Sequence, residues 1–465
     1  MPLPGWELEL LSSLSSSEPE CIVCRGITGS KENMESIDSE VVPLNTKSLF
    51  FSKAISFLKR QQRDWRVTVL RTSIDKLAYQ TVFPYLSIYI VALGATVTQL
   101  GMVNSLGMLA AGTFGPFTGW FIDRTGPKKV YLLGIGLLAV SYLTYGIAQS
   151  WLFTAIAMMA YWLGLSVSQH SCATVCGNCL TNEDRATGMT ICETVAAGLL
   201  GMIGPMLGVS LVTLFGGVNA SGIRPLFFFS LMITAGTFII IRTQLSDRKW
   251  RTRHGTTPNI FRDLYQVMKE GNHLNRWLVI ASVNHLPVAM VFPFSQVFAY
   301  EVKRADQFIL GAMVTASAVT SITFAVPLGR LADRVGRKKV LYGTMPLFWL
   351  SNLMLVWSPA PVFLIIAGIL QGFYYIGGPI SGAMERELVP PEQMGRWLGI
   401  TRFFRMLLSA FMVLISGMIW DGIGPQYVFL LFVVLDFVLR APLLMSMPET
   451  LGIRFGGKIP ESAKE

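Results

Sequence analysis

Apolar residues fill long, nearly continuous segments of this chain from about residue 66 to residue 447, and short polar stretches separate them. A helix needs about 20 mostly apolar residues to cross about 30 Å of hydrocarbon. Twelve segments meet this requirement, and an even number of spans places both termini on one side of the membrane. The expected spans lie near residues 68–93, 98–122, 129–148, 152–179, 187–213, 225–242, 276–299, 308–330, 340–357, 361–385, 397–420 and 426–446.

The composition supports a membrane domain. Of the 465 residues, 52% are hydrophobic and 14% are charged, whereas soluble domains average about 25% charged residues. Soluble enzymes, nucleic-acid binders and secreted disulfide scaffolds are therefore excluded, and the six cysteines indicate no disulfide framework. We expect no enzymatic activity, since no catalytic constellation is present, and we expect no cofactor.

The basic residues predict the orientation. The formal net charge is +10, and Lys and Arg gather in the loops that follow the even-numbered spans. The other loops carry only Arg224, Lys303 and Arg304. Basic loops face the cytoplasm in membrane proteins, so we expect both termini to be cytoplasmic, in a multi-pass protein of the plasma membrane.

The chain repeats itself. Residues 82–85 read VFPY and residues 291–294 read VFPF, an offset of 209, and Arg185 and Arg396 follow at an offset of 211. A nearly constant offset over more than a hundred residues indicates two similar halves. The predicted organisation is a disordered cytosolic tail (1–46), an amphipathic lead-in (47–65), a six-helix bundle (66–243), a cytoplasmic linker (244–275), a second six-helix bundle (276–447) and a cytoplasmic tail (448–465).

Two copies of one loop motif follow the second span of each half. Gly119–Lys129 reads GWFIDRTGPKK and Gly329–Lys339 reads GRLADRVGRKK. Both resemble the loop motif of the major facilitator superfamily, although Pro127 stands where the second copy has Arg337. The resemblance covers about residues 66–450 and implies an all-α membrane fold of twelve helices, arranged as two pseudo-symmetric six-helix bundles that rock about a central site.

In the resembled family this motif gates the inner mouth. A carboxylate can hold a neighbouring helix start, because a helix N-terminus carries about half a positive charge. The alternative is that the basic residues of these loops only set the topology. The resemblance assigns gating to Gly119, Asp123, Arg124, Gly126, Gly329, Asp333, Arg334 and Gly336.

A glycine-rich segment of the fifth span, GLLGMIGPMLG, is similar to the family's antiporter motif. Gly204, Pro205 and Gly208 fit the motif, whereas Val209 replaces its next glycine. Small residues allow close helix packing and proline permits a bend, which suits a hinge or a seal. Ordinary close packing between membrane helices is the alternative.

Polar residues near the middle of the spans are costly in a bilayer and are candidates for substrate binding. In the resembled fold the first, fourth, seventh and tenth helices line the cavity. Each of these residues has an alternative role, which is a hydrogen bond to a neighbouring helix. The candidates are Gln169, His170, Asn284, His285, Gln371, Tyr374 and Tyr375.

A second polar set lies nearer the cytoplasm and suggests either an inner gate or static ion pairs. Its members are Asp75, Glu193, Glu385, Glu387, Arg402 and Arg405. A carboxylate such as Asp75 or Glu193, desolvated in one state and paired in the other, would couple a proton to transport. Cys172, Cys176 and Cys179 form a stripe that we interpret as packing, so no metal site is expected.

These observations predict a secondary active transporter that moves a small organic solute by alternating access. No ATP-binding loop of the G-x-x-x-x-G-K-[ST] type is present. The antiporter-like segment favours export of a drug or metabolite in exchange for protons. Proton-coupled uptake of a sugar or organic acid is the first alternative, and a transporter-like membrane sensor is the second. The expected partners are the substrate, the lipid bilayer and protons, with no nucleic acid, and the protein is expected to be a monomer.

Overall fold

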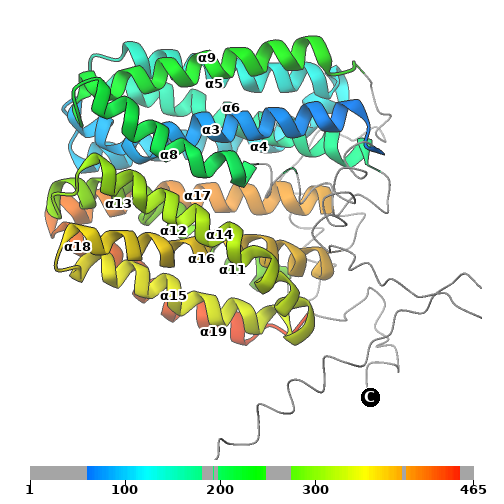
Figure 1. The fold of residues 1–465 in the computed structure, drawn as a ribbon. Helices are drawn as coiled ribbons and strands as arrows, with labels where there is room; N and C mark the ends of the chain where they lie inside the picture. Colours follow the sequence, from blue (N-terminus) through cyan, green and yellow to red (C-terminus); the bar gives the residue numbers. More distant parts are fainter. Residues whose placement is uncertain (1–59, 181–191, 193–196, 248–273, 390–393, 451–465) are drawn as a thin grey trace, which may run out of the picture. The chain divides into compact units, whose positions relative to one another are not determined.

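The computed structural model describes residues 60–180, 192, 197–247, 274–389 and 394–450, and it is helical apart from short connections (Figure 1). Within these residues, nine helices are long and apolar enough to cross a membrane. Three further helices lie at the places of the first, second and fifth predicted spans. The all-α fold is therefore confirmed, and the count of twelve spans stays a prediction.

The first half contains six of these helices. α3 packs against α8 and α9, while α5 packs against α6 and α9. Their bounds are α3 Arg63–Ala92, α4 Val97–Thr125, α5 Pro127–Ile147, α6 Trp151–Cys179, α8 Ala197–Leu214 and α9 Ala220–Gln244.

The second half repeats this order with more interruptions. α16 packs against both α14 and α15. The bounds are α11 Leu274–Val283, α12 Leu286–Met290, α13 Phe292–Val297, η2 Phe298–Val302, α14 Gln307–Val335, α15 Arg337–Trp357, η3 Pro361–Phe363, α16 Leu364–Leu388, α17 Met394–Gly422, α18 Pro425–Leu435, η4 Asp436–Arg440 and α19 Ala441–Met445.

The seventh span is broken, although the hydrophobic pattern predicts one continuous helix over 276–299. Pro287 stands at the start of α12 and Pro293 at the start of α13. Proline has no N–H to donate and its ring clashes with the preceding turn, which interrupts the helix. A π-helical turn, η2, then ends the span. Hydropathy alone does not register these breaks, because the apolar run continues through them.

Helix ends follow local rules in both halves. Thr96 accepts a bond from the Gln99 N–H, and the Gln99 side chain accepts one from the Thr96 N–H, which forms a capping box at the start of α4. Gly126 and Gly336 have φ angles of 89° and 117°, a region that favours glycine, and each connects the second helix of its half to the third. The Lys303 ammonium donates to the Val356 and Ser358 carbonyls at the end of α15, and burial lowers the pKa of this lysine.

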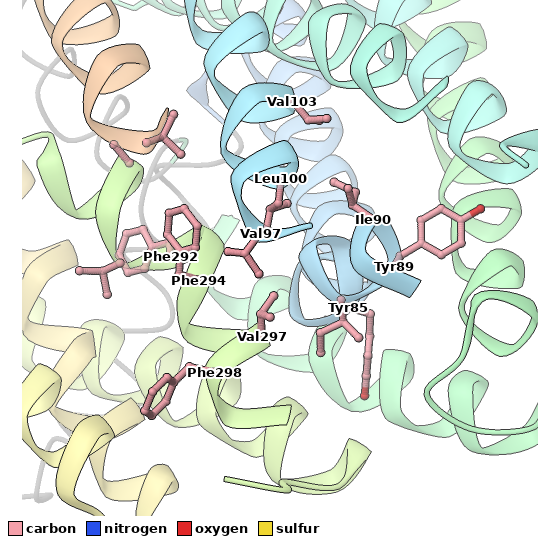
Figure 2. Packing of buried hydrophobic residues seen from close by; sticks show 14 of the residues in the cluster. Tyr85, Tyr89, Ile90, Val97, Leu100, Val103, Phe292, Phe294, Val297 and Phe298 are labelled. Atoms are coloured by element: carbon pink, nitrogen blue, oxygen red, sulfur yellow. The ribbon is translucent and has the colours of Figure 1, made fainter. Parts of the chain in front are cut away.

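The halves contact each other through two equivalent helix pairs: α4 packs on α17, and α14 packs on α8. We call the end of the halves that contains the 93–96 connection the Gly94 end, and the opposite end the Gly126 end. At the Gly94 end, one cluster of buried residues contains side chains of both halves (Figure 2). Toward the Gly126 end the clusters are separate, one with residues from 274 to 447 and one with residues from 65 to 245. The structure is therefore closed at the Gly94 end.

Candidate functional site

A cavity of about 190 Å³ lies between the two halves. Its walls come from α3, α4, α6, α12, α13 and α16, which correspond to the first, second, fourth, seventh and tenth predicted spans. The lining residues are Lys76, Tyr79, Gln80, Phe83, Leu86, Ser87, Asn104, Met158, Tyr161, Trp162, Val288, Phe292, Pro293, Tyr374 and Tyr375.

Aromatic rings dominate both walls of this cavity. In the first half, Tyr79 stacks on Tyr161 with ring centroids 5.8 Å apart. In the second half, Phe292 stacks on Tyr375 with centroids 5.5 Å apart, and Tyr374 meets Phe292 edge to face. Such faces suit a planar apolar solute.

The polar groups of the cavity come mainly from α3, which turns Lys76, Tyr79, Gln80 and Phe83 toward it. These positions are spaced three and four residues apart and therefore share one face of the helix. The Lys76 ammonium lies 5.2 Å from the centroid of the Tyr79 ring. Lys76 is not among the site residues predicted from the sequence, although a lysine inside the first span is the signal that could have found it.

Two of the substrate candidates, Tyr374 and Tyr375, line the cavity, and the structure places the others in different surroundings. Asn284 receives a hydrogen bond from the Arg440 guanidinium on its side-chain oxygen, and the His285 Nδ1 lies 2.9 Å from the Ser409 hydroxyl. Gln371 is buried within α16.

Gln169 and His170 lie on α6 and face the second half. The Arg402 guanidinium on α17 lies 3.5 Å from the His170 Nε2 and 3.5 Å from the Gln169 side-chain oxygen. These three side chains therefore join α6 to α17 across the two halves.

The carboxylates of the second polar set, Glu385 and Glu387, form ion pairs within the second half. Glu385 lies 3.5 Å from Arg405 and accepts a bond of 2.6 Å from the Trp397 indole. Glu387 pairs with Arg337 at 2.8 Å.

Asp75 pairs with Arg71 one turn before it on α3, and it accepts a bond of 3.1 Å from Thr237 on α9. Arg71 in turn donates to the Tyr131 hydroxyl on α5. This pair therefore ties α3 to two neighbouring helices of the first half. Glu193 lies outside the described residues.

The loop motifs lie at the Gly126 end, toward which each half has its own buried cluster. A Cβ placed on Gly119 or Gly329 would meet nothing within 4 Å, so neither glycine makes a close helix contact in this arrangement. The Asp333 side chain is 68% exposed and lies 3.6 Å from Arg337. Arg124 stacks over the Trp120 ring at 4.4 Å, while the Asp123 side chain lies outside the described part of the structure.

The motif lysines contact the last helix of their own half. Lys128 donates to the Leu245 carbonyl just after α9, and Lys338 donates to the Met445 and Met447 carbonyls at the end of α19. The Glu449 carboxylate accepts from the Arg337 backbone N–H at the start of α15. These bonds satisfy backbone groups at helix ends. Lys128 and Lys338 therefore have a structural role in addition to any role in setting the membrane topology.

The glycine-rich segment of α8 lies between α3 and α14. A Cβ on Gly204 would stand 2.7 Å from the Gln80 Cβ, and one on Gly208 would stand 2.5 Å from the Thr81 carbonyl oxygen. The Pro205 carbonyl in turn would lie 3.2 Å from a Cβ on Gly311 of α14. Glycine at 204 and 208 therefore brings α8 into close contact with α3, the helix that carries the polar groups of the cavity.

An unpredicted contact closes the Gly94 end. The Asp421 carboxylate on α17 accepts a bond of 2.8 Å from the Thr98 backbone N–H, in the first turn of α4, and the Thr98 hydroxyl donates to the Gly417 carbonyl. A carboxylate at a helix N-terminus is stabilising. Asp421 thus joins the halves in the manner that the sequence predicts for the motif carboxylates at the opposite end.

The predicted cysteine stripe is part of a cluster. The sulfur atoms of Cys172, Cys176 and Cys192 lie within 4.8 Å of one another, and the four cysteines of the described region are free thiols. They belong to the apolar cluster of the first half, together with Trp65. Cys192 is the member that the stripe on α6 did not predict.

Two helical halves that enclose a cavity at their interface, joined firmly at one end, define an integral membrane transporter of small molecules. The family model for the Major Facilitator Superfamily matches residues 72–301 and 277–452. The chain belongs to this superfamily, as the duplicated loop motif predicts.

Similar proteins include transporters of several kinds. The multidrug resistance protein MdtG of Yersinia enterocolitica is 24% identical over 352 residues, which cover 71% of this chain and 78% of the relative. The crystal structure of the nucleoside transporter NupG matches with a TM-score of 0.65 at 17% identity, covering 83% of this chain and 100% of that chain. The human organic anion transporter MFSD10 matches with a TM-score of 0.63 at 18% identity, covering 83% and 99%. The structural matches show the shared fold.

Proposed function

We propose that this protein exports a small organic solute across the plasma membrane in exchange for protons, acting as a monomer with both termini in the cytoplasm. The observation that carries the proposal is the cavity of about 190 Å³ whose walls come from both halves. Rocking of the halves would open this cavity first to one side and then to the other. The similarity to the multidrug resistance protein MdtG supports export.

The proposed gating is based on the different contacts at the Gly94 end and the Gly126 end. The shared apolar cluster and Asp421 close the Gly94 end, which the basic loops predict to face outward. At the Gly126 end, Asp333 is exposed, and Gly119 and Gly329 are free of close contacts. We assign Gly119, Gly329 and the motif carboxylates to a latch that engages when this end closes and the Gly94 end opens.

Asp75 is the proposed proton carrier, because it combines a side chain that is only 16% exposed with a partner that would be affected by its protonation. It lies in the α3 turn next to the cavity residue Lys76 and holds Arg71. A proton on Asp75 would weaken the pair with Arg71 and thereby loosen the bonds that α3 makes to α5 and α9. Proton binding would thus be linked to the position of the helix that carries the substrate contacts.

The test uses the purified protein in liposomes with an imposed pH gradient, an internal pH dye and small organic compounds added one at a time. The expected result is compound-dependent proton movement whose direction indicates exchange. The Asp75→Asn variant should lose this movement and keep compound exchange in the absence of a gradient. Asp436→Asn is the matched control, because Asp436 is also buried and pairs with an arginine one turn away, at 3.1 Å from Arg440.

Three other outcomes would each contradict part of the proposal. Proton and compound movement in the same direction would replace export by the uptake alternative. Unchanged pH dependence in Asp75→Asn would refute the proton role of this carboxylate. Loss of pH dependence in both variants would show that any broken ion pair, rather than Asp75 in particular, is responsible.

A further inference from the structure

Lys76 places a positive charge in the cavity, and the described part of the chain supplies no counter-charge for it. Among the residues that the structure describes, no carboxylate forms an ion pair with Lys76, and the adjacent Asp75 is held by Arg71. Lys76 is partly exposed. Withdrawing an unpaired charge even partly from water is costly, and the Tyr79 ring 5.2 Å away offsets only part of the cost. A cation kept in such a place is explained by a negative ligand.

The neighbouring helix leaves room for this lysine. A Cβ on Gly201 of α8 would lie 3.2 Å from the Lys76 Cγ and 3.7 Å from its Cε. Because Gly201 has no side chain, the aliphatic stem of Lys76 can pack directly against the backbone of α8. The glycine-rich segment of α8 therefore accommodates the stem of a cavity residue as well as packing against α3.

Two further polar atoms of the cavity residues are buried without a hydrogen-bond partner. They are the Trp162 indole Nε1 and the Gln80 side-chain oxygen. Leaving a buried donor or acceptor unpaired costs about 1–3 kcal/mol, and neither atom is exposed to the cavity in this state. The Cδ1 edge of the Trp162 indole lies against Gly107 of α4, so Trp162 contributes an aromatic wall to the cavity.

The size and walls of the cavity define the rest of the ligand. Its volume of about 190 Å³ slightly exceeds that of an apolar cavity of about 150 Å³ that holds benzene. The walls are aromatic in both halves, with Tyr79 and Tyr161 facing Phe292 and Tyr375 across the site. This combination fits one aromatic ring with a compact charged group.

We propose that the cavity binds small aromatic monoanions, with Lys76 as the counter-charge and the aromatic walls as the ring-binding surface. The proposal rests on the transport function proposed above and names its substrate class. Lys76 binds the anionic group, and the rings of both halves sandwich the ring of the solute. Closure of either end would then bring the two walls onto one ligand.

The test measures equilibrium binding of radiolabelled benzenesulfonate to the full-length protein in detergent. Competitors of similar size are the neutral benzenesulfonamide and the cation phenyltrimethylammonium. Benzenesulfonate keeps its charge at every pH of interest. The expected order is tight binding of the anion, with the neutral compound at least about tenfold weaker and the cation weaker still. Equal binding of all three, or preference for the cation, would overturn the proposal without any variant.

Variants then locate the charge. Lys76→Gln should weaken benzenesulfonate binding by about tenfold or more and leave benzenesulfonamide within about twofold. Lys76→Arg keeps the charge and should retain most of the affinity. Lys128→Gln removes a lysine that bonds the Leu245 carbonyl far from the cavity lining, and it serves as the matched control. Unchanged anion affinity in Lys76→Gln would refute the role of Lys76.

The failure of this inference differs from a failure of the proposed function. Proton movement driven by neutral or cationic compounds alone would leave proton exchange intact and refute the anion preference. Binding and transport of benzenesulfonate that depend on Lys76, without any proton movement, would support the inference and refute proton exchange.

Discussion

The contact between α4 and α17 at the Gly94 end predicts how a single methyl group changes the conformational equilibrium. A Cβ on Gly101 would lie 2.8 Å from the Val413 carbonyl oxygen and 3.5 Å from the Gly417 Cα. These neighbours are backbone atoms, which cannot rotate away as a side chain can. Gly101→Ala therefore forces the two helices apart by several tenths of an ångström wherever the Gly94 end is closed.

The magnitude follows from the cost of overpacking. Adding a methyl group to a tightly packed site costs about 1–3 kcal/mol. In the rocking mechanism this contact is lost when the Gly94 end opens, so the cost falls on the closed state alone. The ratio of open to closed molecules should then rise about 5- to 150-fold.

The assay follows the access of a buried thiol from outside. Val297 on α13 is fully buried in the shared cluster (Figure 2), and Val297→Cys in a background without the six native cysteines provides the reporter. A membrane-impermeant thiol reagent should modify it about 5- to 150-fold faster when Gly101→Ala is added. Gly136→Ala on α5 is the control, since a Cβ there meets nothing within 4 Å.

The reasoning fails if Gly101→Ala leaves the modification rate unchanged in folded protein. It fails equally if Gly136→Ala raises the rate as much, because the effect would then come from the added methyl and not from the contact. Monodisperse elution of each variant shows that the protein is folded before the rates are compared.

Two further predictions concern carboxylates with defined donors. Asp421→Asn removes the charge at the start of α4, worth about 0.3–1 kcal/mol, and should raise the modification rate of the same reporter about two- to fivefold; no change would show that the contact does not hold this end. Trp397→Phe removes the indole donor of the buried Glu385 and should lower stability by about 1–3 kcal/mol, seen as a lower Tm. The control Trp357→Phe, at a residue 65% exposed, should change the Tm little, and equal shifts for both would contradict the assignment.

The helices and their order could be predicted from the sequence, because a membrane span is a local property of composition and length. The duplicated motif and the repeat offset also predicted the two halves, because an internal repeat is visible when the sequence is compared with itself. The breaks in the seventh span at Pro287 and Pro293 were not predicted. A proline within an apolar run is compatible with a bent helix as well as with a broken one, so the sequence alone does not distinguish them.

The site was less predictable, because its residues are selected by contacts between distant helices. Tyr374 and Tyr375 line the cavity, whereas the Asn284 side chain accepts a hydrogen bond from Arg440. The position of a residue along its predicted span does not distinguish these two situations. Asp421 lies near a predicted helix end, but its partner is more than three hundred residues away. Lys76 was visible as a charge in the first span, and only the arrangement of α3, α8 and α13 shows what it faces.

The unequal distribution of the buried clusters has a thermal consequence. Opening the Gly94 end must separate apolar side chains of both halves, such as Tyr85 and Phe294, whereas the clusters toward the Gly126 end each lie within one half. Exposure of apolar surface to water raises the heat capacity, and the attraction between apolar groups weakens on cooling. The balance between the two states of this protein should therefore vary with temperature along a curve, with cooling favouring the state that is open at the Gly94 end.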